Sequence, residues 1–242
     1  MKQYEFKWSI FPVSESAVLV EFGKEINKDI HQIVRMFAKY LDEHPFTGMV
    51  EYVPAFSTLT IFYDAVKVKS VTEGEQQCCE IVSLMIDKML CNLNLSLEGK
   101  VRIVKIPVCY GGEFGPDLQY VARYNNISLD RVIKIHSSNE YVVYMIGFAP
   151  GFPYLGGMSK EISTPRRKSP RKSVPIGSVG IAGMQTGIYP ISTPGGWQII
   201  GSTPRALFCP HKCPPSILKP GDIVKFYSIS LSEYEKYKES EK

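Results

Sequence analysis

Residues 178–208, SVGIAGMQTGIYPISTPGGWQIIGSTPRALF, carry the strongest indication of the fold class of the second half of the chain. Short β-branched and aromatic runs alternate in it with glycine and proline, at residues 178–182, 187–189, 197–200 and 206–208. Runs of this length between turn-forming residues predict short strands joined by tight corners. The pattern is typical of a small all-β barrel or sandwich.

The segments on either side extend this prediction. Residues 101–110, 141–148 and 223–227 have the apolar patterns of further strands. Two short helices are expected at residues 117–124 and 128–136, with Asp117 and Ser128 as candidate N-caps.

The first half alternates element types in the order ββαββα. Two strands are predicted within residues 8–22, and two more at 49–53 and 58–63. Apolar residues at helical spacing predict a helix over 27–43, which ends before Pro45. A second helix is predicted near 73–91, with a capping box at Thr72 and Glu75.

These patterns predict an α+β protein of two domains and a tail. We expect an N-terminal α+β domain at residues 1–98, a β-barrel domain at 99–230 and a charged C-terminal tail at 231–242. The tail is rich in lysine and glutamate, and it is the part of the chain where we expect disorder.

Composition excludes several classes of protein. The chain has 242 residues, 44% of them hydrophobic, and no apolar run approaches the roughly 20 residues that span a bilayer. The charged N-terminus has no signal-peptide core, so we expect a cytoplasmic protein with no membrane partner. The six cysteines show no disulfide pattern, and we expect free thiols and no metal. A metal held by Cys209, His211 and Cys213 is the alternative.

Charge is unevenly distributed along the chain. Residues 162–221 contain no Asp or Glu, yet they hold eight of the cations of a chain whose net charge is only +4. These cations are Arg166, Arg167, Lys168, Arg171, Lys172, Arg205, Lys212 and Lys219. A basic segment of this kind favours an anionic ligand or an acidic partner, and a solvated basic loop is the alternative. Nucleic acid is not expected, because aromatic residues do not interleave with the cations at 164–175.

No standard catalytic or nucleotide-binding motif is present. The two Gly-Lys pairs, at residues 23–24 and 99–100, lack the rest of a P-loop, and neither HExxH nor GxSxG occurs. A self-contained hydrolase is therefore not supported. Any ATP site would be non-standard or shared with another chain.

Other motifs supply candidate functional residues. The string GFAPGFPYLGG, residues 147–157, holds three aromatics and two prolines between its glycines, and rigid aromatic loops often line pockets or partner surfaces. Prolines restrict the backbone of the cationic stretch 164–175, and arginine binds carboxylates and phosphates through two nitrogens. Gln185 and Tyr189 offer neutral hydrogen-bonding groups, and Gly195–Gly196 exposes backbone N–H groups. His136 is a candidate acid or base, with a structural role as the alternative.

Four strings resemble the KipI / allophanate hydrolase subunit 1 family. They are YGGEFGPDLQYVA (110–122), GFAPGFPYLGGM (147–158), TPRRKSPRKSVPIGSVGIAGMQTGIYPISTPGGWQIIGSTP (164–204) and LKPGDIVKF (218–226). The resemblance implies an N-terminal α+β domain and a C-terminal cyclophilin-like β-barrel. It also implies a role in a bacterial 5-oxoprolinase, which converts 5-oxo-L-proline to L-glutamate with ATP hydrolysis.

The same resemblance implies cofactors, partners and site residues. ATP, with Mg²⁺, would be a co-substrate shared with a partner of the KipA / allophanate hydrolase subunit 2 type, which is the C subunit. A LamB/YcsF-type A subunit would open the ring, and the chain alone would be inactive. The candidate catalytic residues are His136, Arg166, Arg167, Gln185 and Tyr189. The candidate substrate-binding residues are Phe148, Pro150, Phe152, Tyr154, Gly195, Gly196, Trp197 and Gln198.

Two other functions stay open at this stage. The family name implies inhibition of a sporulation histidine kinase, for which an apolar groove lined by Phe148, Phe152 and Tyr154 would be expected. A urea amidolyase component is the other, because allophanate hydrolase subunit 1 shares these motifs.

Overall fold

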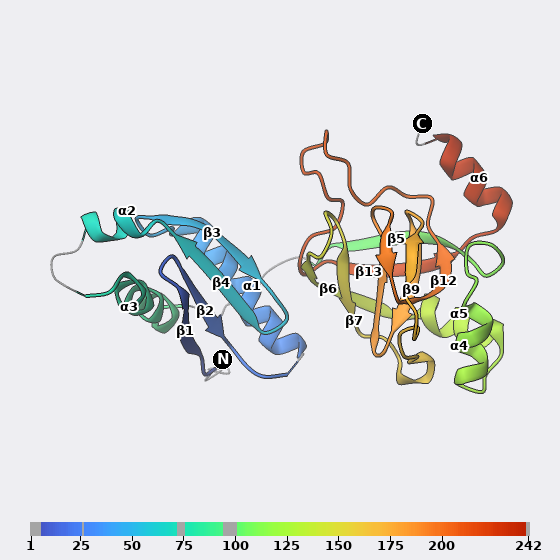
Figure 1. Cartoon of the computed structure of the whole chain (residues 1–242), viewed down its shortest axis with the longest axis horizontal. Coiled ribbons are helices and arrows are strands. Elements are labelled where there is room, and N and C mark those ends of the chain that lie inside the picture. Colours follow the sequence, from blue (N-terminus) through green and yellow to red (C-terminus); the bar gives the residue numbers. More distant parts are fainter. Residues whose placement is uncertain (1–5, 26, 72–75, 94–100, 241–242) are drawn as a thin grey trace. The chain divides into compact units, whose positions relative to one another are not determined.

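The computed structural model describes residues 6–25, 27–71, 76–93 and 101–240, and it divides into two compact units. The units comprise residues 1–99 and 100–242. Each unit has its own hydrophobic core. Figure 1 shows the helices and strands of both units. The predicted α+β class, with a β-barrel in the second half, is confirmed.

The first unit is a four-stranded antiparallel sheet with helices packed on it. Its strands are β1 (Ser9–Ser14), β2 (Ala17–Glu21), β3 (Met49–Pro54) and β4 (Thr58–Tyr63), and its helices are α1 (Lys28–Glu43), α2 (Ala65–Ser70) and α3 (Cys78–Cys91). The strand order is β1-β2-β4-β3. Alternate residues of the central strands, such as Val18, Val20, Leu59 and Ile61, point into one core. Helix α1 contacts β3 and β4, and α3 contacts β1 and β2.

The predicted helix at 73–91 is wrong in its start. Helix α3 begins at Cys78, where the Glu80 carboxylate accepts a hydrogen bond from the backbone N–H of Gln77. The predicted cap at Thr72 and Glu75 lies outside the described residues. The sequence patterns also failed to predict α2, which Asp64 caps by accepting from the N–H groups of Val66 and Lys67.

The second unit contains a closed seven-stranded barrel. The strands follow the order β10-β7-β6-β13-β5-β12-β9. In chain order they are β5 (Ile103–Tyr110), β6 (Glu140–Ile146), β7 (Pro153–Gly156), β9 (Ser178–Ala182), β10 (Gln185–Ile188), β12 (Gln198–Ser202) and β13 (Ile223–Ser228). Neighbouring strands are antiparallel except β5 and β13, which pair in parallel although more than a hundred residues separate them in the sequence. Closure leaves the barrel without a free edge.

Helices and a short ribbon lie outside the barrel wall. Helix α4 (Leu118–Tyr124) packs on β12, α5 (Leu129–Ser138) on β13, and α6 (Leu231–Ser240) on β5. A 3₁₀ turn covers Lys160–Ile162. Strands β8 (Arg171–Val174) and β11 (Thr193–Gly195) form a separate two-stranded ribbon.

Two expectations for this unit are corrected. The tail is helical over α6 because Ser230 and Glu233 cap it reciprocally and the Tyr234 ring is buried against Phe114. The predicted strand at 206–208 forms only one bridge, between Phe208 and Ser216. Proline at positions 210, 214 and 215 removes the N–H donors that a ladder would need.

Candidate functional site

Asp117 fixes the cationic loop, residues 164–175, to the barrel unit. The Asp117 side chain is buried, and its Oδ1 accepts from Nη1 of Arg167 at 3.0 Å and from Nη2 of Arg171 at 2.9 Å. Its Oδ2 lies 2.8 Å from Nη1 of Arg171 and accepts from the backbone N–H of Ile199 at 2.7 Å. One carboxylate thus holds two guanidinium groups and one strand of the barrel.

This role of Asp117 differs from the predicted one. Asp117 does occupy the N-cap position of α4, but its side chain makes no capping hydrogen bond. The two arginines take up its oxygens instead. The sequence patterns did not predict this pairing, because 50 and 54 residues separate the partners along the chain.

Backbone contacts join the cationic loop to the glycine turn, Gly195–Gly196. The N–H of Arg167 donates to the carbonyl of Gly196 at 2.7 Å, and the Gln198 amide donates to the carbonyl of Pro165 at 2.9 Å. The β8–β11 ribbon pairs Gly195 with Arg171. The structure therefore brings together the cationic loop and the glycine turn.

An aromatic cluster of Phe152, Tyr189 and Trp197 lies beneath this loop. The Phe152 ring centroid lies 5.5 Å from that of Tyr189 and 5.7 Å from that of Trp197, both edge to face. All three rings are buried. Pairs of this geometry add about 0.5–1.5 kcal/mol beyond the area that they bury. These residues thus support the loop from within, and they offer little surface to a ligand.

The 147–157 loop contributes the exposed part of the predicted aromatic set. Tyr154 packs edge to face on Phe152 and is half-buried. Phe148 is 67% exposed and has a φ of 66°, a conformation that is strained for a bulky residue. Pro150 is also exposed. Strain of this kind is often found at functional loops.

The environment of Tyr189 combines burial with positive charge. Burial raises the pKa of its hydroxyl, while a hydrogen bond from the Trp197 backbone and the charges of Arg166 and Arg171 oppose that rise. A Cβ at Gly195 would lie 2.5 Å from the Tyr189 hydroxyl oxygen. Glycine is therefore required at position 195 for the turn to sit on this ring.

His136 lies apart from the cationic loop, within the barrel core. It has no exposed surface, and its ring stacks on Phe226 with centroids 4.6 Å apart. Since the Thr186 hydroxyl donates to the Gly180 carbonyl, it accepts from Nε2 of His136, at 2.9 Å. Nδ1 then accepts from the Tyr110 hydroxyl at 2.7 Å.

Burial lowers the pKa of His136 to about 3, so the ring is neutral near pH 7. Any part in chemistry would run through Tyr110 or Thr186, because the ring itself does not reach the surface. The structural alternative for His136 fits this placement.

Two further candidate residues, Gln185 and Arg166, are at least partly exposed. Gln185 begins β10 and is partly exposed. Arg166 is exposed, and within the described parts of the chain it has no ion-pair partner. Among the three arginines of the loop, Arg166 is therefore the one best placed to meet a ligand.

The region offers positive charge and backbone donors for an anion. Arg167 and Arg171 share the buried Asp117 carboxylate, and Arg166 adds a further charge that acts on Tyr189, so the region keeps a net positive charge. Over the described residues, no group of three or more His, Cys, Asp or Glu side chains is placed to hold a metal ion. The chemistry favoured by these residues is stabilisation of negative charge on a carboxylate or phosphate.

Comparisons with known proteins add the family context. The model of the carboxyltransferase domain, subdomain C and D, matches residues 8–218. The B subunit of the 5-oxoprolinase of Bacillus subtilis (strain 168) is 54% identical over 96% of this chain and 98% of its own length. The corresponding B subunit of Haemophilus influenzae 5-oxoprolinase is 42% identical over 90% of this chain and 96% of its own.

A solved structure supports the fold. The crystal structure of TTHA0988 matches with a TM-score of 0.75 and 32% identity. The match covers 89% of this chain and 40% of that longer one.

Proposed function

The chain belongs to the family of the carboxyltransferase domain, subdomain C and D, and from that premise we propose that it is the B subunit of an ATP-dependent 5-oxoprolinase. The observation that carries the proposal is the 54% identity, over nearly the whole of both chains, to a protein of that name. The complex would convert 5-oxo-L-proline to L-glutamate.

The chemistry of a lactam explains why ATP would be needed. A five-membered lactam is a poor electrophile. Transfer of the terminal phosphoryl group of ATP to its amide oxygen, with ADP leaving, would turn that oxygen into a good leaving group. Water would then open the ring, and phosphate and glutamate would be released. Negative charge develops on oxygen in both steps, and preorganised cations and N–H groups stabilise it.

Residues of the cationic loop are suited to part of this task. Arg166 is the exposed guanidinium, while Arg167 and Arg171 are held in place by Asp117. We propose that Arg166 contacts the substrate carboxylate. Gly195 and Gly196 would add backbone donors from the adjacent turn.

Partner subunits complete the proposal. The chain lacks a P-loop, so we propose that a KipA / allophanate hydrolase subunit 2-type C subunit shares the ATP site and brings Mg²⁺ with the nucleotide. A LamB/YcsF-type A subunit would open the ring. The match covers only 40% of the TTHA0988 chain, so in that protein the matching region is joined to further sequence. This supports association of the present chain with other subunits.

A cytoplasmic location is part of the same proposal. All six cysteines are free, as expected in a reducing compartment. Within the described residues, no helix has both the length and the apolar character required to cross a bilayer.

The deciding experiment is reconstitution with the A and C subunits, ATP and 5-oxoproline. Glutamate and ADP are expected to form together, and the chain alone is expected to form neither. If the complete complex forms no glutamate, the proposal is wrong.

A single substitution tests the site. Arg166→Ala is expected to lower kcat/KM by about 100-fold, since it removes one charge-stabilising donor without breaking an ion pair. Arg35→Ala, at an exposed position on α1, is the matched control and should leave turnover unchanged. Size-exclusion chromatography checks that both variants assemble. Unchanged turnover by Arg166→Ala would remove the cationic loop from the site.

The kinase-inhibitor alternative gains no support from the aromatic loop. It called for an apolar groove lined by Phe148, Phe152 and Tyr154. Of these, Phe152 is buried and Tyr154 is half-buried, and Phe148 alone is well exposed.

A further inference from the structure

A second basic region, distinct from the cationic loop, surrounds an open cavity on the barrel unit. The cavity has a volume of about 740 Å³, which falls within the range of small-molecule sites. Its lining includes four cations, Arg102, Lys105, Arg205 and Lys225, and no Asp or Glu. None of the candidate site residues belongs to it.

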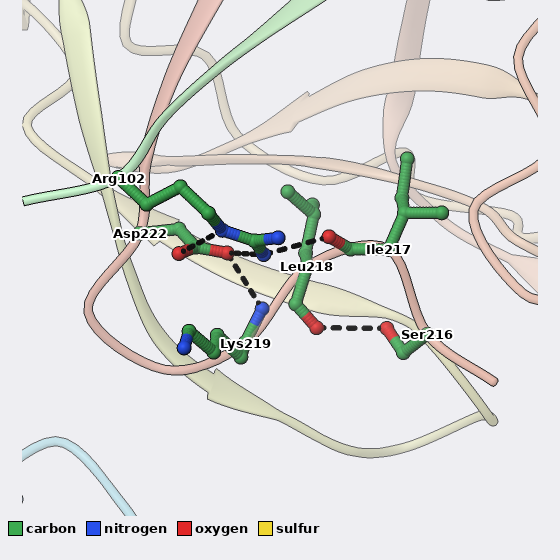
Figure 2. A network of polar contacts seen from close by, with 6 residues as sticks. All are labelled: Arg102, Ser216, Ile217, Leu218, Lys219 and Asp222. Atoms are coloured by element: carbon green, nitrogen blue, oxygen red, sulfur yellow. Dashed lines mark hydrogen bonds and ion pairs between the residues drawn. The ribbon is translucent and has the colours of Figure 1, made fainter. Parts of the chain in front are cut away.

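Two of these four cations are neutralised by neighbours outside the lining. Arg102 donates through Nε to Oδ1 of Asp222 at 2.8 Å and pairs with Oδ2 through Nη2, which also donates to the Ile217 carbonyl at 2.8 Å (Figure 2). Lys225 lies 2.6 Å from the Glu140 carboxylate. Their main contribution is to shape the rim.

The other two cations supply the net charge. Within the described residues, neither Lys105 nor Arg205 takes part in an ion pair. Arg205 donates one hydrogen bond, from Nη1 to the Lys105 carbonyl at 3.0 Å, which places the guanidinium beside β5 and leaves its other donors available. The parallel register sets Lys105 opposite Lys225. Together with Arg205, these lysines place three cationic side chains on the outer face of β5 and β13.

Apolar side chains provide the rest of the lining. Ile103, the first residue of β5, is 52% exposed, and Pro214 and Ile217 line the cavity from the segment before β13. Hydrogen bonds hold that segment, because Ser216 donates to the Leu218 carbonyl and Asp222 accepts from the Lys219 N–H (Figure 2). The site thus combines a fixed apolar wall with two available cations.

We propose that this cavity binds a phosphate-bearing small molecule with a flat apolar part, the chemical class of nucleotides. Lys105 and Arg205 contact the phosphates, and Ile103, Pro214 and Ile217 pack on the ring. The anion preference follows from the lining alone. The choice of a nucleotide rests on the proposed function, which requires ATP and assigns it no residue of this chain.

Calorimetric titration of the full chain with ATP at low ionic strength tests the proposal. The Lys105→Gln/Arg205→Gln double variant is expected to bind ATP roughly 100-fold more weakly, about tenfold for each cation that is replaced. The matched control is Lys134→Gln/Arg123→Gln, which removes one lysine and one arginine from exposed helix positions. It should bind like the parent, within twofold.

Binding that is absent in the parent chain, or equal in the two double variants, overturns the proposal. Inorganic triphosphate is expected to bind more weakly than ATP, because it lacks the ring. Equal affinities would overturn the role of the apolar wall.

The titration and the reconstitution fail independently. A complex that turns over 5-oxoproline with an unchanged KM for ATP in the Lys105→Gln/Arg205→Gln variant would sink the cavity and leave the proposed function standing. If ATP binding depends on Lys105 and Arg205 but the complex forms no glutamate, the nucleotide cavity stands and the proposed function is wrong.

Discussion

Two buried aspartates, Asp117 and Asp222, organise the two basic regions of the barrel unit in different ways. Each is no more than 5% exposed, and each accepts a backbone N–H as well as arginine donors. Asp117 serves two arginines of one loop, whereas Asp222 serves Arg102 alone. Around Asp117, two arginines share one carboxylate, which leaves an excess positive charge. Around Asp222 the ion pair is balanced, and the excess positive charge of the cavity comes from Lys105 and Arg205.

The contrast shows that a count of cations along a sequence does not give the charge that a ligand meets. Of the acid-free segment, Arg167 and Arg171 are largely committed to holding structure, and Arg166 and Arg205 are not. Substitutions at the two aspartates and at His136 test how each buried group contributes to stability and to the charge that a ligand meets.

The largest effect is expected from Asp117→Ala. It leaves two partly buried guanidinium groups without their carboxylate, and breaking such a pair costs about 3 kcal/mol of the free energy of unfolding. Urea denaturation measures it in a Trp8→Phe background, where Trp197 is the remaining indole and reports on the barrel unit. Glu113→Ala, at an exposed position, should change stability by less than about 0.5 kcal/mol, which is the typical range for surface substitutions. A loss below about 1 kcal/mol for Asp117→Ala would contradict the anchoring role.

A smaller loss of stability is expected when the pH is lowered, because His136 is buried in its uncharged form. Its pKa is about 3 when folded against 6.5 for an ordinary histidine, so between these values the unfolded chain binds more protons. The stability contributed by the neutral ring is complete above pH 6.5 and is lost as pH falls, by about 1.4 kcal/mol per pH unit. At pH 5 the loss is about 2 kcal/mol.

His136→Gln is the control for this pH effect, because it keeps a donor and an acceptor and does not titrate. The stability difference between parent and variant should shrink from pH 7 to pH 5. A constant difference would show that His136 does not set the pH dependence.

The smallest effects are expected from Asp222→Asn, which should lower stability and raise ATP affinity. The amide oxygen still accepts from Lys219, and Arg102 is half exposed, so stability should fall by only about 1 kcal/mol. Release of Arg102 adds a cation to the cavity, and ATP affinity should rise about threefold. Denaturation and calorimetry on the same variant check both. A fall in ATP affinity would make the two aspartates equivalent anchors and remove the distinction drawn between them.

Local patterns predicted much of the fold because they report on local forces. Apart from the short helix α2, the predicted ββαββα order of the first unit matches the structure, and strands β9, β10, β12 and β13 also follow from apolar periodicity and turn residues. Helix α6 was missed although Ser230 and Glu233 form a capping-box pattern, because the surrounding charge indicated disorder. Strand β8 was missed because its residues are cationic and follow proline, and it forms only by pairing with β11.

The site was harder to predict because its contacts are distant in sequence. Within the segment 164–204, hydrogen bonds join Arg167 to Gly196 and Gln198 to Pro165, two contacts that the sequence patterns did not predict. The arginine partner Asp117 lies outside that segment, and so does Phe152, which packs on Tyr189 and Trp197. An acid-free segment with eight cations can draw a carboxylate from elsewhere in the chain, and that imbalance is the signal that could have indicated a partner such as Asp117.

The parallel pairing of β5 with β13 sets an order for biosynthesis. Translation proceeds from the N-terminus, so the sheet of the first unit is complete once β4 has emerged, while the barrel wall stays open until residue 228 is made. During that interval β5 has no partner on its β13 side, and its apolar residues Val104, Ile106 and Val108 await cover. A nascent chain stalled before residue 223 should therefore expose a barrel seam to chaperones and proteases, while the first unit is already folded.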